Sequence, residues 1–263
     1  MALKEDILNI IGLETSSDYL DSTEIADIYP IMSDAVYRAV CSLPAKLMLE
    51  NCAVTMDVEN LVDNIPGNDP FPEASIPDDG FELNDGDIIL AVERTASSSA
   101  LNTGGAWVEN YTTRFAKEIV STQRLQSLDS ESIYFATDYS PVYWIETSGT
   151  TPAKKKIFTA PSSAASKNTI NNANYLNTHA SAIRVWYYPK QTLTSAHTIF
   201  SYTPNYIKEF LLKVCAVALI NTKIASQATE EEDSELMQLL GNVKAIFEED
   251  CKNQLLNYQE KYK

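Results

Sequence analysis

The chain has 263 residues, 44% of them hydrophobic, enough for one large domain or two small domains with a substantial core. Its formal net charge of −16 argues against a protein whose whole surface binds nucleic acid or an anionic membrane. The most apolar segment, Val214 to Ile220, is far shorter than the roughly 20 residues that a membrane span needs. The sequence therefore predicts a soluble protein.

The four cysteines, Cys41, Cys52, Cys215 and Cys251, are far apart and form no C-x-x-C pair. They are predicted to be reduced residues of the core, in a chain that folds in a cytosol. The N-terminal stretch MALKEDILNIIGLETSS carries acids where an export signal requires bases, so no export signal is expected.

Helices are expected at the start of the chain. Apolar residues recur at helical spacing from Leu3 to Ile11, and Gly12 ends the pattern. A longer helical pattern follows over residues 22–50. Pro44 is expected to kink this second helix or to split off its last piece, because proline lacks the N–H that an inner turn requires.

Residues 53–203 consist of short β-like runs between clusters of Gly, Pro, Ser, Asn and Asp. The expected strands are residues 88–92, 133–136, 142–146, 156–160 and 183–188. Residues 84–87, with the sequence NDGD, have the chemistry of a hairpin turn. The spacing in residues 113–128 fits either a helix or a strand and leaves that choice open.

Helical periodicity returns over residues 204–227 and 230–258. These two helices are expected to pair as an antiparallel hairpin, because only a few residues join them. Each helix has an apolar stripe that another helix must bury. The predicted fold is therefore α+β, with a helical bundle built from the N-terminal helices (1–52) and the C-terminal hairpin (204–263), and an inserted β-rich domain with long loops (53–203).

No recognised catalytic or cofactor motif is present. The sequence lacks G-x-S-x-G, H-E-x-x-H, a P-loop and G-x-G-x-x-G. Its two histidines, His179 and His197, lie in polar surroundings. Asp85 and Asp87 form an acid pair that could bind a cation or act as acid and base, although acids are common in turns for turn geometry alone. We therefore expect no enzyme, with no catalytic residue, no cofactor and no metal site.

Charged residues are segregated along the chain. Residues 47–93 contain 12 acids and no base, whereas residues 147–208 contain seven bases and no acid. Solvated loops are one explanation. If the two segments meet within one subunit, they hold the β-rich domain together. If they lie on opposite sides, the acidic flank of one copy faces the basic flank of the next in a head-to-tail contact.

The head-to-tail alternative defines a set of candidate subunit-interface residues in a homo-oligomer. The acidic candidates are Asp57, Glu59, Asp63, Asp69, Asp78, Asp79, Asp85 and Asp87. The basic candidates are Lys154, Lys155, Lys156, Lys167, Arg184 and Lys190, with the aromatic residues Trp186 and Tyr188 on the same strand.

The aromatic strand AIRVWYYPK (182–190) is followed, after a polar loop, by the apolar helix YTPNYIKEFLLKVCAVALI (202–220). This layout, and residues 141–263 in general, resemble a module of bacteriophage head-to-tail connector proteins, the adaptors or ring proteins below the portal. The positions that match are Tyr187, Tyr188, Pro189, Pro204, Ile207, Leu211 and Ala218. The chain is most similar to the connectors of short-tailed phages, with the ring proteins of crAss-like phages as a candidate group.

This resemblance implies a structural virion protein that is assembled in the host cytoplasm and takes part in DNA ejection. It implies a ring, commonly of twelve copies, that docks on the portal protein, surrounds the DNA channel and contacts other tail or ring proteins. A negative subunit suits DNA that must pass without specific binding. No membrane partner is expected. Residues 162–177 are expected to order only on assembly.

Two other functions remain open. Trp107, Trp144 and Trp186 could hold a glycan, as in a tail or surface module, although core and interface positions are more common for such aromatics. A hydrolase built on Asp85 and Asp87 would need a third functional group, which the sequence does not supply.

Overall fold

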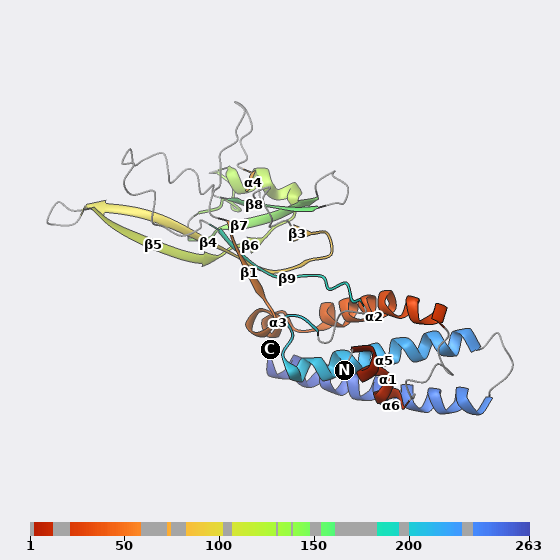
Figure 1. Ribbon diagram of the computed structural model, residues 1–263. Coiled ribbons are helices and arrows are strands. Elements are labelled where there is room, and N and C mark those ends of the chain that lie inside the picture. Colours follow the sequence, from red (N-terminus) through yellow and green to blue (C-terminus); the bar gives the residue numbers. More distant parts are fainter. Residues whose placement is uncertain are drawn as a thin grey trace. The chain divides into compact units, whose positions relative to one another are not determined.

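The computed structural model describes eleven stretches of the chain: residues 3–12, 22–58, 73–74, 83–101, 107–129, 131–137, 139–147, 154–160, 183–194, 200–227 and 234–263. The chain divides into two compact units, which are described separately below (Figure 1). Residues 1–52 and 190–263 form a helical unit, and residues 53–189 form a β-rich unit. The predicted α+β class is therefore confirmed.

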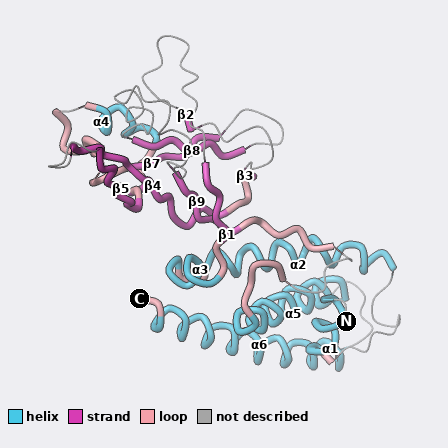
Figure 2. Tube along the Cα trace, turned by 60° about the vertical axis from the view of Figure 1, so that its left-hand side comes forward, coloured by secondary structure: helices cyan, strands magenta, loops and turns pink. Residues whose placement is uncertain are grey.

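The described residues of the helical unit form five α-helices: α1 (Leu3–Ile11), α2 (Ser22–Ser42), α3 (Ala45–Asn51), α5 (Asn205–Gln227) and α6 (Ser234–Lys261). Helix α5 contacts α1, α2 and α6, and it lies between α2 and α6 (Figure 2). Leu211, Cys215 and Ala216 of α5 are fully buried, as is Met32 of α2. The apolar stripe of α5 is therefore the centre of this unit's core, as expected for a helix that contains the most apolar segment of the sequence.

The predicted helix ends at Gly12 and Pro44 are confirmed. Gly12 follows α1 with φ +78°, a conformation that glycine adopts without the steric cost of a Cβ. Pro44 separates α2 from α3, because its ring and its missing N–H do not fit within a continuous helix. Pro30, in contrast, lies inside α2.

Residues 190–203 belong to the helical unit, whereas the sequence pattern predicted them to be part of the β-rich domain. Leu193 and Phe200 are each 2% exposed, and the Leu193 N–H donates to Ser33 Oγ of α2 at 2.9 Å. The side-chain amide of Gln191 pairs with the backbone of Ser201 through two hydrogen bonds of 2.7 and 2.9 Å. The described residues of this segment, 190–194 and 200–203, are not helical, so helical periodicity could not reveal which unit they join.

Two sheets build the β-rich unit. The first has the strand order β1-β9-β4-β5, from β1 (Val54–Val58), β9 (Ile183–Tyr188), β4 (Ile88–Leu101) and β5 (Trp107–Phe115). The second has the order β2-β8-β7-β6, from β2 (Glu73–Ala74), β8 (Lys154–Ala160), β7 (Val142–Thr147) and β6 (Lys117–Glu118), and β3 (Leu83–Asn84) also pairs with β8. The pairs are antiparallel except for β6 with β7. In Figure 1, β4 and β5 form one long two-stranded ribbon.

Apolar side chains cover both faces of strand β7. Tyr143 packs in a core that also contains Val92 and Val185 of the first sheet, so this core lies between the two sheets. Val142 and Trp144 point to the opposite face, because side chains alternate along a strand. There the Trp144 ring stacks on Phe158 with a centroid distance of 5.5 Å and an interplanar angle of 4°.

The structure settles three predictions about local structure, those for residues 133–136, 113–128 and 84–87. Residues 133–136 form turns and loop instead of the predicted strand. Residues 113–128 contain both candidate structures: the end of β5, β6, a 3-10 helix η1 (Ser121–Gln123) and helix α4 (Arg124–Leu128). Residues 84–87 form a turn, but it connects the two sheets rather than closing a hairpin, because β3 pairs with β8 and β4 pairs with β5 and β9.

Candidate interaction surfaces

The acidic and basic segments meet inside one chain. Strand β9 of the basic segment lies between β1, which belongs to the acidic segment, and β4, whose first part (residues 88–93) belongs to it. Arg184 is opposite Asp57 in one pair and opposite Glu93 in the other. Directly opposite residues in antiparallel strands have their Cβ atoms about 5 Å apart, where opposite charges are favourable. For these strands the structure places the two segments together within a subunit, one of the two arrangements that the sequence left open.

Asp87 and Lys155 are joined across the two segments. Lys155 Nζ donates to the backbone carbonyl oxygen of Asp87 at 2.6 Å. The Asp87 side chain is buried, and its Oδ2 accepts the Asn84 N–H at 2.8 Å. The Asp87 carboxylate therefore shapes the turn, whereas Asp85 is exposed. In the part of the chain that the structure describes, no group of three His, Cys, Asp or Glu side chains could hold a metal ion.

The other candidate residues have different surroundings. Trp186 is half-buried and its indole N–H donates to Glu93 Oε2 at 3.4 Å. Tyr188 is 2% exposed, whereas Lys190 is exposed with Nζ 5.2 Å from the centre of the Tyr37 ring. Lys154 is half-buried. The candidates that lie outside the described residues are Glu59, Asp63, Asp69, Asp78, Asp79 and Lys167, together with His179, His197 and residues 162–177; for Asp57 and Lys156 only the backbone is described.

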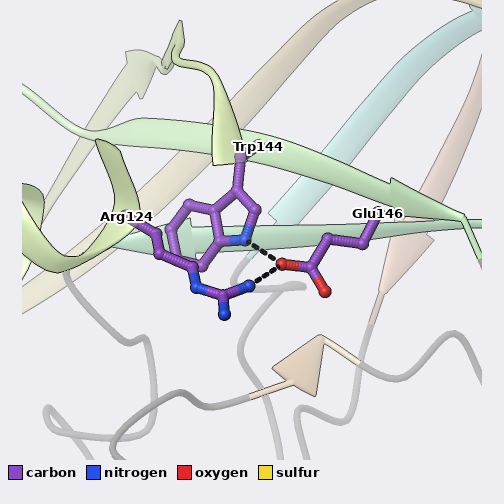
Figure 3. A network of polar contacts seen from close by, with 3 residues as sticks. All are labelled: Arg124, Trp144 and Glu146. Carbon is purple, nitrogen blue, oxygen red and sulfur yellow. Dashed lines mark hydrogen bonds and ion pairs between the residues drawn. The ribbon is translucent and has the colours of Figure 1, made fainter. Parts of the chain in front are cut away.

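A polar network attaches α4 to strand β7. One carboxylate oxygen of Glu146 accepts the indole N–H of Trp144 at 3.3 Å and also accepts from Arg124 Nη1 (Figure 3). A second contact acts nearby, where the Tyr143 hydroxyl donates to Glu118 Oε2 at 3.0 Å. Burial, followed by the Glu118 charge, raises the pKa of Tyr143 and keeps its hydroxyl protonated. These bonds hold helix α4, which precedes the loop that begins at Glu131, against the second sheet.

The loop after α4 exposes large apolar side chains. We call the described residues 131–137, 139 and 140 the aromatic loop. Ile133 is 91% exposed, Tyr139 77%, Tyr134 49% and Phe135 42%. The sequence did not predict this surface, because the run Ile-Tyr-Phe-Ala has the composition of a buried strand. The signal that could have revealed it is the acidic flanking sequence, with Asp129 and Glu131 on one side and Asp138 on the other.

Hydrogen bonds give the aromatic loop a defined backbone. The Ser132 N–H donates to Asp129 O at 2.9 Å, and the Phe135 N–H donates to Ser132 O at 3.0 Å. Ala136 is 2% exposed in the core beside Trp144, and its N–H donates to Ser127 O at 2.8 Å. The loop is therefore anchored at its base while its apolar tip faces solvent.

A groove runs along α5 in the helical unit. It has a volume of about 430 Å³ and lies between α2 and α6. The side chains that α2 and α5 contribute are mostly small, such as Ala35, Ala39 and Ala218, which leaves this space open. Arg38 of α2 and Lys252 of α6 are exposed at its edge. We call this feature the helical groove.

The cysteines are free thiols in different surroundings. Cys52 and Cys215 are buried, and burial raises the pKa of Cys52 to about 11 and that of Cys215 to about 12. Cys251 is half-buried, and burial likewise raises its pKa to about 11. Such thiols are poor nucleophiles at neutral pH. The prediction of a core position is wrong for Cys41, which is exposed.

Comparison with known proteins identifies no family, because no family model, no curated protein and no solved structure gives a significant match to this chain. Among the described helices, none combines the length and the hydropathy that crossing a membrane would require.

Proposed function

We propose that the chain is the subunit of a bacteriophage head-to-tail connector, a non-enzymatic virion protein whose ring docks on the portal protein and surrounds the DNA channel. The observation that carries this proposal is the aromatic loop. Ile133 and Tyr139 are held in solvent on an anchored backbone, and exposed apolar surface of this kind marks protein–protein contact sites. A protein that assembles from many copies needs such a site.

In this proposal the two units have separate tasks. The N- and C-terminal helices form a helical bundle that builds the ring, and the β-rich unit contacts a neighbouring copy or the next tail component. A role in assembly agrees with the division of the chain into two units that each have their own core. The protein is assembled in the host cytoplasm and resides in the virion, with other tail or ring proteins as partners and no membrane contact.

The charge of the chain supports a passage for DNA. Twenty bases against 36 acids leave a formal charge of −16. A ring of such subunits repels the phosphate backbone, and repulsion prevents the counterion release that drives non-specific binding to DNA. DNA therefore passes through the ring without being held by it.

Imaging and mass measurement of the purified protein, alone and with its portal protein, test this function. The expected result is a closed ring of identical copies, or a ring that forms on the portal. Reversing Lys154 and Lys190 together is expected to weaken assembly if the charged segments also bridge copies. Lys155 is best left unchanged in that variant, because it holds the turn at Asp87. A strictly monomeric protein that does not bind the portal would contradict the proposal.

A glycan-binding tail or surface module is the second candidate. Trp144 is 1% exposed and is therefore not available as a platform, but Tyr134 and Tyr139 of the aromatic loop are exposed rings of the kind that stack on sugars. Glycan-array binding that is lost in Tyr139→Ala, by a protein that forms no ring, would favour this second function.

A further inference from the structure

The helical groove is an apolar site that the described part of its own chain leaves open. Its lining comes from three helices and includes Ala35 and Ala39 of α2, Val214 and Val217 of α5, and Cys251 and Leu255 of α6. Its volume of about 430 Å³ lies within the range of about 300–1,000 Å³ that is typical of ligand-binding pockets. A groove of this composition is best filled by apolar side chains that exclude water.

The charged side chains among the residues that line the groove are both cations. Arg38 and Lys252 are exposed there, and neither forms an ion pair within the described residues. Both cations lie beside the apolar floor of the groove, in a chain of net charge −16. They favour an occupant whose apolar tip is flanked by acids.

The aromatic loop has this chemistry. Its tip presents Ile133, Tyr134 and Phe135, and the exposed acids Asp129 and Glu131 precede the tip directly. Because hydrogen bonds already fix the backbone of the loop, little conformational entropy is lost when it binds. Apolar surface and charge are thus complementary between two sites on the same chain.

We infer that the aromatic loop of one copy docks in the helical groove of a second copy. This inference rests on the proposed assembly of identical subunits and names the surfaces that join them. The contact is heterologous, because the loop and the groove are different surfaces. Repetition of such a contact closes a ring when the rotation between copies allows it. Glu131 faces Lys252 or Arg38, and Ile133 enters the apolar floor.

Two variants remove the two sides of the contact. In the loop variant, Ile133→Ser and Tyr139→Ser remove the two most exposed apolar side chains of the loop, which contribute little to the fold of their own chain. In the groove variant, Ala35→Trp fills the groove from α2 and Lys252→Glu reverses its edge. The matched control is Leu239→Ser with Ile246→Ser, which removes two exposed apolar side chains from α6, 59% and 63% exposed.

Sedimentation and light scattering of the full chain measure the result, with far-UV circular dichroism to establish that each variant is folded. The loop and groove variants are each expected to weaken self-association by about tenfold or more, as for hot-spot residues, whereas the α6 control changes it by about twofold or less. A mixture of loop variant and groove variant is expected to form one-to-one dimers and nothing larger, since only one intact junction remains. Glu131→Lys is expected to restore part of the association that Lys252→Glu removes.

Other outcomes separate this inference from the proposed function. If the wild-type protein assembles and both variants assemble equally well, the loop–groove contact is wrong while the connector function stands. If the α6 control alone dissociates the assembly, α6 is the contact and the inference is wrong. If the loop variant forms rings but no longer binds the portal, the aromatic loop binds the portal instead of a second copy. That result also overturns the loop–groove inference. A protein that stays monomeric and does not bind the portal overturns both the connector function and the loop–groove contact.

Discussion

Lys155 Nζ donates to the carbonyl oxygen of Asp87 across 2.6 Å, although 68 positions separate the two residues in the chain. This bond connects strand β8 of the basic segment to the turn between β3 and β4 of the acidic segment. Together with the pairing of β9 between β1 and β4, it shows that part of the charge segregation serves the β-rich unit itself. Contacts between copies can then use charges that remain exposed, such as Lys190 and Asp85.

Lys155→Met tests this connection. Methionine keeps most of the apolar stem but removes the charged donor, so the β-rich unit is expected to lose about 1–3 kcal/mol in its free energy of unfolding. The three tryptophans all belong to this unit, so urea unfolding followed by Trp fluorescence reports on it. Lys117→Met, at an exposed position of β6, is the control, and an equal loss in both variants would argue against the bond.

Trp144 is expected to contribute mainly through packing. Trp144→Ala should destabilise the β-rich unit by about 3–5 kcal/mol, because it leaves a cavity beside Phe158. Trp144→Phe keeps an aromatic ring and loses the bond to Glu146, whose carboxylate retains Arg124, so a smaller loss of about 1–2 kcal/mol is expected. Chemical denaturation of both variants, followed by near-UV circular dichroism, gives the order of the two losses. The reverse order would mean that the polar network dominates.

Ser33 holds Leu193 on α2. Ser33→Ala leaves the Leu193 N–H without its acceptor at a buried position, and the expected cost is about 1–3 kcal/mol in the helical unit. Ser42→Ala is the matched control, because Ser42 is exposed and its hydroxyl donates only within its own helix. Its effect should stay within about 0.5 kcal/mol. Far-UV circular dichroism during denaturation measures both, and equal effects would contradict an anchoring role for Ser33.

Cys215 makes the helical unit sensitive to alkaline pH. Its pKa rises from 9.0 to about 12 on burial, so the folded chain holds this proton more tightly than the unfolded chain. The stabilisation is therefore complete below pH 9 and is lost as the pH rises towards 12. Between these values Cys215 adds a slope of up to about 1.4 kcal/mol per pH unit.

The Cys215→Ala variant is expected to lack this slope. Its free energy of unfolding, measured by denaturation at several pH values from 8 to 11, should fall less steeply than that of the wild-type protein. Ser42→Ala, an exposed position that carries no thiol, should keep the wild-type slope. Parallel curves for the wild-type protein and the Cys215 variant would show that the thiol does not titrate in the unfolding transition.

The sequence by itself determined the elements that depend on neighbours along the chain. The helical stripes, the break at Pro44, the end at Gly12 and the strand at 183–188 follow from spacing and local sterics, and the structure contains each of them. It also separated a helical part from a β-rich part, because the two have different apolar periods.

Only the tertiary structure decided which segments meet. The run Ile133–Ala136 has the composition of a strand but is not paired in a sheet, so its first three residues are exposed and Ala136 alone is buried. Residues 190–203 joined the helices through the bond between Leu193 and Ser33. The helical groove exists because α2 and α6 pack on either side of α5 with small side chains facing the gap. Each of these outcomes depends on contacts between distant residues, which the local pattern of side chains does not encode.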